Sequence, residues 1–248
     1  MKNNQFYDDL SSDYDSMLNF EKLVTNRTKA LSKFIKSEYK CAIDIGCGTG
    51  ADSIALTNNG LSVTGYDTSL KMIQKAKLNA KERSLKIRFS DSLVQSISSI
   101  NHSKYDLVVS LGNAVANIHP VILKKIFRKV YKLLRPGGSF IIQILNYNSI
   151  RKTNKRIVNI TRGKESLFIR FYDFEKNKLN FNVLKVNDND FHDYNLITTE
   201  LYEHKGNELK TLLSRAGFSG IKLYSDLNKS KFNSRLSKDL ILTAVKLN

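Results

Sequence analysis

The feature that most constrains this chain is a cluster of three glycines, Gly46, Gly48 and Gly50, between an apolar run and a helix-forming segment. Residues 41–45 have the pattern of a short strand, and residues 51–58 have that of a helix. Glycines at such a junction allow positive φ angles and close approach of the backbone to a ligand, and the following helix offers free N–H groups. The pattern therefore predicts a nucleotide-type ligand at this loop.

Strands and helices alternate beyond the glycines. Further strands are predicted at residues 61–66, 86–89, 107–110 and 140–145, and helices at 70–82 and 120–134. Strands separated by helices imply right-handed crossovers and a parallel sheet. After residue 145 the helical signal fades, and strand-like runs separated by turn residues predict a meander or hairpins. These runs cover residues 167–174, 179–186 and 194–202, and they are followed by a helix at 208–216 and strands at 221–224 and 240–247.

Composition limits the partners that we expect. The formal net charge of this 248-residue chain is +17, but the basic residues are spread along it, so nucleic acid is possible and not favoured. No apolar run approaches the ~20 residues that span a bilayer, and the first residues lack the features of a secretory signal.

Cys41 and Cys47 lie too close together for a useful disulfide. We expect reduced thiols, a cytoplasmic protein, no membrane contact and no metal site.

Two carboxylates flank the glycine loop in the sequence. Asp67 closes the second predicted strand, where a carboxylate can accept both ribose hydroxyls. Gly46, Gly48 and Ala51 also fit the dinucleotide-binding pattern, so spacing alone leaves a dehydrogenase open. Asp44 precedes the glycines, where its carboxylate can hold the loop through backbone N–H groups and approach a cationic amino group.

With these residues the chain resembles class I S-adenosylmethionine (SAM)-dependent methyltransferases over nearly its whole length. The strongest stretch covers residues 42–73, and the turn L-R-P-G-G at 134–138 is also typical. Within the class, the chain looks most similar to the glycine N-methyltransferase group, including the bacterial glycine/sarcosine enzymes. The supporting matches are C-G-T-G-A-D-S-I, L-G-N at 111–113, N-Y-N-S-I at 146–150 and N-R-T-K-A-L at 26–31.

The resemblance implies an α/β, Rossmann-like methyltransferase fold. Its sheet is expected to be mostly parallel and seven-stranded with helices on both faces, and an antiparallel β segment is inserted after the fifth strand. We expect a single domain with an N-terminal helical lid at 1–40 and a SAM-binding core at 41–150. The inserted substrate-side segment covers 151–203, and a C-terminal helix and strands cover 204–248.

The resemblance also implies roles for individual residues. Gly46, Gly48 and Gly50 would cradle the methionine part of SAM, and Asp67 would bind the ribose. The full set implied for the cofactor is Tyr14, Arg27, Asp44, Gly46, Cys47, Gly48, Gly50, Asp67, Thr68, Met72, Asp91, Ser92 and Leu111. Met72 would pack against the adenine or lie in the helix core. Arg27 would pair with the SAM carboxylate or be an ordinary solvated arginine.

The acceptor side departs from that group. An arginine that binds the glycine carboxylate is expected where this chain has Leu145, and a histidine is expected where it has Asn117. Glycine itself is therefore in doubt as acceptor. Arg170 and Tyr172 offer a replacement anchor, or they belong to an ordinary strand. The residues expected to bind substrate are Asn113, Asn117, Asn146, Tyr147, Arg170 and Tyr172.

The sequence leads to one main functional hypothesis and leaves alternatives open. We expect a methyltransferase that acts on a small molecule, on the nitrogen of an amine or amino-acid-like acceptor. A neutral amine needs no dedicated base, so no catalytic acid or base is assigned. One alternative is an RNA methyltransferase, although Ser110-Leu111-Gly112-Asn113 differs from the motif of enzymes that methylate base amino groups. Another is a SAM-binding subunit or sensor without turnover.

Overall fold

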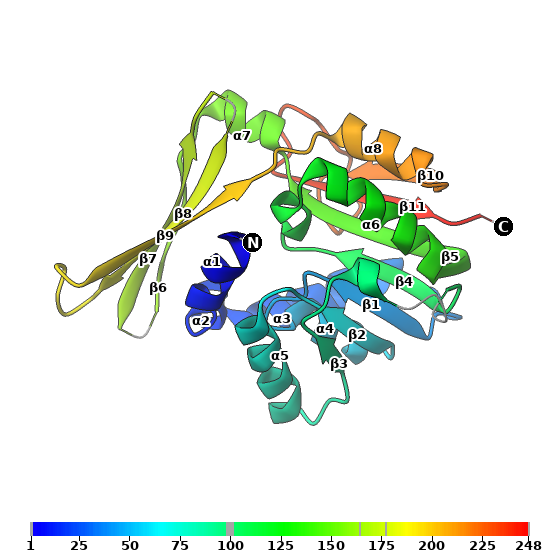
Figure 1. Cartoon of the computed structure of the whole chain (residues 1–248), viewed down its shortest axis with the longest axis horizontal. Helices are drawn as coiled ribbons and strands as arrows, with labels where there is room; N and C mark the ends of the chain where they lie inside the picture. Colours follow the sequence, from blue (N-terminus) through cyan, green and yellow to red (C-terminus); the bar gives the residue numbers. More distant parts are fainter. Residues whose placement is uncertain (1, 98–101, 164, 177, 248) are drawn as a thin grey trace.

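The computed structural model describes residues 2–97, 102–163, 165–176 and 178–247, which form two β-sheets and the helices that cover them (Figure 1). The larger sheet has seven strands in the order β10-β11-β5-β4-β1-β2-β3. Its strands are β1 (Cys41–Ile45), β2 (Ser62–Tyr66), β3 (Arg88–Ser90), β4 (Tyr105–Ser110), β5 (Leu134–Leu145), β10 (Ser219–Tyr224) and β11 (Asp239–Val245). The first five are parallel, and β11 runs antiparallel between β5 and β10. The expected Rossmann-like methyltransferase fold is confirmed.

Helices cover both faces of this sheet (Figure 1). On one face, α6 (Pro120–Leu133) and α8 (Gly206–Arg215) bury Phe127 and Leu209 against side chains such as Phe140. On the other, α3 (Phe20–Leu31) and α4 (Ala51–Asn58) pack on the alternate residues of the same strands. The helix α5 (Leu70–Glu82) follows β2 and contacts β3. Because both faces of the central strands β1, β4, β5 and β11 are covered, these strands are largely apolar and buried.

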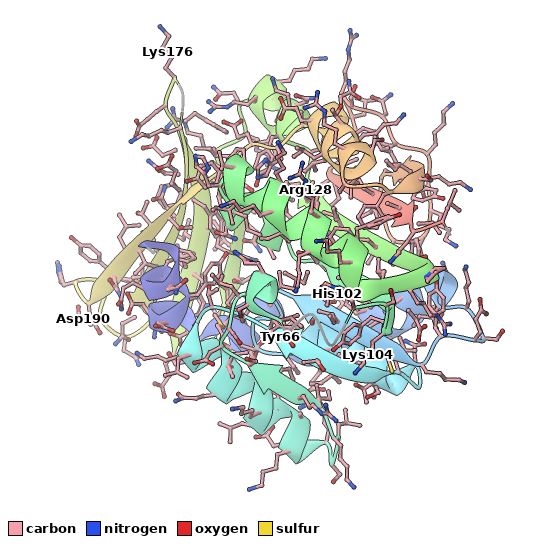
Figure 2. The ribbon with its side chains drawn as sticks, turned by 45° about the vertical axis from the view of Figure 1, so that its right-hand side comes forward. Tyr66, His102, Lys104, Arg128, Lys176 and Asp190 are labelled. Carbon is pink, nitrogen blue, oxygen red and sulfur yellow. The ribbon has the colours of Figure 1, made fainter. Side chains whose placement is uncertain are left out.

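The smaller sheet is an antiparallel meander with the order β6-β7-β8-β9. Its strands are β6 (Ile157–Arg162), β7 (Ser166–Phe174), β8 (Leu179–Asn187) and β9 (Tyr194–Leu201). It lies to one side of the core, and the N-terminal helices α1 (Lys2–Leu10) and α2 (Tyr14–Leu18) lie between the two sheets (Figure 1). Phe6 and Met17 of these helices pack on Phe168 of β7. Figure 2 shows Lys176 and Asp190 at opposite ends of the small sheet.

Three local predictions differ from the structure. The strand β6 and the helix α7 (Tyr147–Thr153) were not predicted, because their polar residues mask the periodicity. The strand β5 begins at Leu134, not at residue 140. The turn at 134–138 joins the sheet because Leu134 pairs with Tyr105, and the Gly137 N–H donates to the Lys246 carbonyl at 2.8 Å.

Short 3-10 helices complete the described elements: η1 (Ser32–Phe34), η2 (Val94–Ser96) and η4 (Ala114–Asn117). Among the described residues, no helix is both long and apolar enough to cross a bilayer. Within the same residues, His, Cys, Asp and Glu side chains form no group of three or more that suits a metal ion.

Candidate cofactor and acceptor site

The predicted cofactor residues come from separate segments and meet at one edge of the large sheet. Asp44 and Gly46 lie where β1 ends, Asp67 follows β2, and Leu111 follows β4. These three strands are parallel neighbours, so their carboxyl ends lie at the same edge. Ligands of open α/β sheets bind at this edge.

The conformation of the glycine loop depends most on Gly46. Its φ is +73°, and a Cβ at this position would lie 2.5 Å from the Cβ of Ala114 in η4. The N–H groups of Gly46 and Cys47 both donate to the carbonyl of Tyr66, at 2.7 and 3.1 Å. The loop is therefore fixed between the end of β2 and η4, and only glycine fits its first position.

Asp67 holds the next part of the loop. Its carboxylate accepts hydrogen bonds from the backbone N–H of Gly48 at 2.8 Å and from that of Ser69 at 2.9 Å. Burial raises the pKa of Asp67, and these N–H donors oppose that rise. A Cβ at Gly48 would lie 3.8 Å from the ring of Tyr14, so α2 covers this side of the loop. Burial also raises the pKa of Tyr14 to about 12.

Asp44 is a buried carboxylate with one unused oxygen. Only 1% of the residue is exposed, and its Oδ2 accepts a hydrogen bond from the Ser53 hydroxyl at 2.7 Å. Its Oδ1 has no hydrogen-bond partner among the described residues. Burial raises the pKa of Asp44, and the nearby charge of Asp52 adds to this rise. A cationic amino group placed at this oxygen would neutralise the charge, so Asp44 fits the amino group of SAM.

Arg27 already has a carboxylate partner in the protein. Its Nε lies 3.0 Å from Oδ1 of Asp52 in the first turn of α4, and its Nη2 donates to Oε1 of Gln143 at 2.6 Å. The same Gln143 oxygen accepts the N–H of Gly112 at 3.3 Å. Arg27 thus ties α3, α4 and β5 together behind the loop. Its contact with the SAM carboxylate stays a prediction.

Sequence reasoning did not identify Asp52, Ser53 or Gln143 as parts of this site. Asp52 and Ser53 carry a usable signal, because they lie two and three positions after the last glycine, in the first turn of the helix. Gln143 is a polar residue inside the apolar run of β5, which in retrospect marks a side chain with a specific partner.

The first helix fastens itself to the loop after β2. The Ser69 hydroxyl donates to Oδ1 of Asp8 at 2.5 Å. The Thr68 hydroxyl donates to Asn4 at 2.8 Å, and the Asn4 amide donates back to the Thr68 carbonyl at 3.1 Å. These contacts hold α1 over the edge of the sheet where the predicted site lies.

The remaining predicted cofactor residues differ in exposure. Met72 and Leu111 are buried, and burial raises the pKa of the buried Cys47 thiol. Ser92 is half-buried and Asp91 is exposed, both in the turn after β3. Their expected contacts with SAM stay predictions.

Asn113 and Tyr147 meet beyond the ends of β4 and β5. The Asn113 amide donates to the Tyr147 hydroxyl at 2.9 Å, and its carbonyl accepts the N–H of Leu145 at 3.0 Å. Asn113 has a left-handed backbone with φ +68°. Tyr147 is only 3% exposed, and burial raises its pKa well above the ordinary value.

The other two predicted asparagines have different surroundings. Asn117 donates to the hydroxyl of Tyr7 at 2.9 Å, which joins η4 to α1. Asn146 is buried and donates to the carbonyls of Ser234 and Ser237, at 3.0 and 2.8 Å. Its side chain therefore holds the segment before β11 in place, and its expected contact with substrate stays a prediction.

Arg170 and Tyr172 both lie on β7 of the small sheet. The Arg170 Nε donates to Oδ1 of Asn159 on β6 at 2.5 Å. Tyr172 is buried, and its ring centroid lies 5.8 Å from that of Phe181. Residues two apart on a strand share a face, so Arg170 and Tyr172 both face away from solvent, toward the core and the N-terminal helices.

Comparison with known proteins places this geometry in context. Residues 42–138 match the family model described as a methyltransferase domain. A probable SAM-dependent methyltransferase of Saccharomyces cerevisiae is 35% identical over 112 residues, covering 44% of this chain and 37% of that protein. Glycine N-methyltransferase of Rattus norvegicus is 32% identical over 127 residues, covering 45% of this chain and 42% of that enzyme. The matched region thus spans less than half of either relative.

Solved structures extend the likeness to the whole fold. A SAM-dependent methyltransferase from Clostridium acetobutylicum superposes with a TM-score of 0.75 over 98% of this chain and 99% of that one. The two sequences are 18% identical. At this identity the likeness shows the fold, including the small sheet, and leaves the acceptor open.

Proposed function

We propose that this chain, which carries a class I SAM-dependent methyltransferase domain, transfers the methyl group of SAM to the nitrogen of a small amine. The observation that carries the proposal is the pair of carboxylates around the glycine loop, of which Asp44 is buried and Asp67 half-buried. Asp67 bonds to the N–H of Gly48, and Asp44 keeps one oxygen without a partner among the described residues. These two groups suit the ribose and the amino group of this cofactor.

The chemistry of the cofactor determines what the protein must supply. SAM provides a methyl group on a positively charged sulfur, ready for in-line displacement. The protein then has to position the acceptor and exclude water. In our proposal α1 and α2 exclude water, since Tyr14 of α2 covers Gly48 of the glycine loop and Asp8 of α1 binds Ser69 in the loop after β2. Asn113 and Tyr147 are proposed to orient the acceptor.

Nitrogen is the favoured acceptor atom because the tyrosine hydroxyls near the site are poor bases. Burial raises the pKa values of Tyr7, Tyr14 and Tyr147, so these hydroxyls stay protonated at neutral pH. A neutral amine has a free electron pair and needs no base before it attacks. An alcohol acceptor requires one. The name of the rat relative, a glycine N-methyltransferase, also supports nitrogen.

The test is methyl transfer from labelled SAM to a panel of amines, amino acids, amino sugars, alcohols and RNA. We expect labelled product with at least one amine, and no labelled alcohol or RNA. Asp67→Ala should lose turnover, whereas Asp190→Ala, at the far end of the small sheet (Figure 2), should keep it. Transfer to RNA or an alcohol alone would contradict the proposal. Tight SAM binding without transfer to anything in the panel or in a cell extract would instead favour a non-catalytic subunit.

A further inference from the structure

Arg170 lies on the inner face of the small sheet, in the row between Phe168 and Tyr172 of the same strand. Phe168 packs against α1 and α2, and Tyr172 packs in the core cluster that contains Tyr147. The residue opposite Arg170 on β8 is Val183, which is fully buried. The arginine side chain therefore lies among buried aromatic and apolar side chains of this face, with Lys185, which lies opposite Phe168 and pairs with Asp13, as its cationic neighbour on β8.

The guanidinium of Arg170 differs from those of the other half-buried arginines in its hydrogen-bond and ion-pair partners. Its Nε donates to Asn159 at 2.5 Å, and among the described residues no carboxylate forms an ion pair with it. Every other half-buried arginine in the described part of the chain has a carboxylate partner. These pairs are Arg27–Asp52, Arg83–Glu21, Arg135–Asp106 and Arg151–Glu203.

A half-buried cation without a counter-ion is unfavourable, because it has lost part of its hydration and gained no opposite charge. Burial accordingly lowers the pKa of Arg170. The Asn159 contact fixes the Nε side and leaves the two terminal nitrogens for another partner. A planar pair of N–H donors is the geometry that binds a carboxylate through two parallel hydrogen bonds.

Arg170 also lies close to the groups proposed to hold the reactants. Its charge acts on the hydroxyls of Tyr14 and Tyr172 and opposes the rise that burial causes in their pKa values. Tyr14 is the residue whose ring covers Gly48 of the glycine loop. An anion bound by Arg170 would thus lie on the small-sheet side of the cofactor loop.

We infer that the methyl acceptor carries a carboxylate, which Arg170 binds with its two terminal nitrogens while the acceptor nitrogen faces the glycine loop. This inference rests on the proposed methyltransferase function. In this inference the carboxylate is bound by Arg170 on β7. The arginine expected at the end of β5 is absent, because the chain has Leu145 there.

The experiment compares matched acceptors that differ only in this group. Each amino acid in the labelled-SAM assay is tested beside its carboxamide, with the parent chain, Arg170→Gln and Arg170→Lys. Arg162→Gln is the matched control, because Arg162 lies on the same sheet, is 71% exposed and pairs with Asp188 at 3.2 Å. Thermal unfolding and SAM binding are measured for every variant to show that each is folded.

We expect the acid to exceed its amide in kcat/KM by roughly 10- to 100-fold, the effect of hydrogen bonds to a charged group. Arg170→Gln should remove this preference without changing the affinity for SAM, Arg170→Lys should keep part of it, and Arg162→Gln should keep it all. Equal rates for acids and amides in the parent chain would overturn the inference while leaving the methyltransferase proposal intact. A preference for the acid over its amide that persists in Arg170→Gln would also overturn the inference.

A binding measurement keeps the inference testable if no acceptor in the panel turns over. Saturation-transfer NMR is recorded with the full chain, S-adenosylhomocysteine, and either propionate or propionamide as probe. A propionate signal that Arg170→Gln abolishes and Arg162→Gln preserves supports the anchor. Absence of that signal in the parent chain, or its persistence in Arg170→Gln, refutes it. Failure of the proposed function is seen separately, as an absence of SAM binding.

Discussion

Substitution of Gly46 by alanine tests the geometry of the glycine loop directly. The φ of +73° costs a residue with a side chain about 1–2 kcal/mol. The new Cβ would also lie 2.5 Å from the Cβ of Ala114, and relief of such overpacking costs about 1–3 kcal/mol. The total loss of roughly 2–5 kcal/mol corresponds to a fall in Tm of about 10 °C for a chain of this size.

Two further variants separate the two causes. Gly60 also has a positive φ, +86°, but a Cβ there meets nothing within 4 Å, so Gly60→Ala should show the backbone cost alone. Adding Ala114→Gly to Gly46→Ala removes the other methyl group and should recover much of the remaining loss. The measurement is urea unfolding of the ligand-free chain. Equal losses in Gly46→Ala and Gly60→Ala, with no recovery in the double variant, would refute the close contact between the loop and η4.

Three other predictions follow from buried polar groups. Burial raises the pKa of Asp44 above the ordinary value of about 4, so the folded chain keeps a proton that the unfolded chain releases. Stability of the ligand-free chain should therefore fall as pH rises from that value toward the raised pKa, and Asp44→Asn should flatten this dependence. The measurement is Tm against pH, and the same profile in Asp44→Asn as in the parent chain would contradict the prediction. Tyr147→Phe leaves the Asn113 amide without its partner and should cost about 1–3 kcal/mol, measured by urea unfolding, with SAM affinity kept; an unchanged free energy of unfolding would show that this hydrogen bond contributes nothing. Asn146→Ala removes two hydrogen bonds to the segment before β11, so limited proteolysis there should accelerate while calorimetric SAM affinity stays constant; loss of SAM binding would instead give Asn146 a direct part in the site.

The glycine loop and its flanking elements were predictable because their signals are local. The strand at β1 and the helices α4 and α5 begin and end at the predicted residues, since apolar runs, glycines and a serine cap mark them. The order of the strands required the resemblance, because no short stretch of sequence specifies that β11 inserts between β5 and β10.

The partners of the site residues were not predictable in the same way. Arg27 was expected to meet a ligand, yet its nearest carboxylate belongs to Asp52, 25 residues later in the chain. Asn146 was expected near the acceptor, yet its amide bonds to carbonyls about 90 positions away. Such contacts depend on how distant elements pack, so sequence reasoning identifies the residue types and the structure supplies their partners.

Calorimetric titration with SAM is the most direct test of the central claim, that Asp44, Asp67 and the glycine loop form a SAM site. The parent chain and Asp190→Ala should bind SAM and not NAD. Asp67→Ala should bind SAM at least about tenfold more weakly, because hydrogen bonds to a charged group contribute about 1.5–3 kcal/mol. Binding of NAD in place of SAM, or full SAM affinity in Asp67→Ala, would contradict the account.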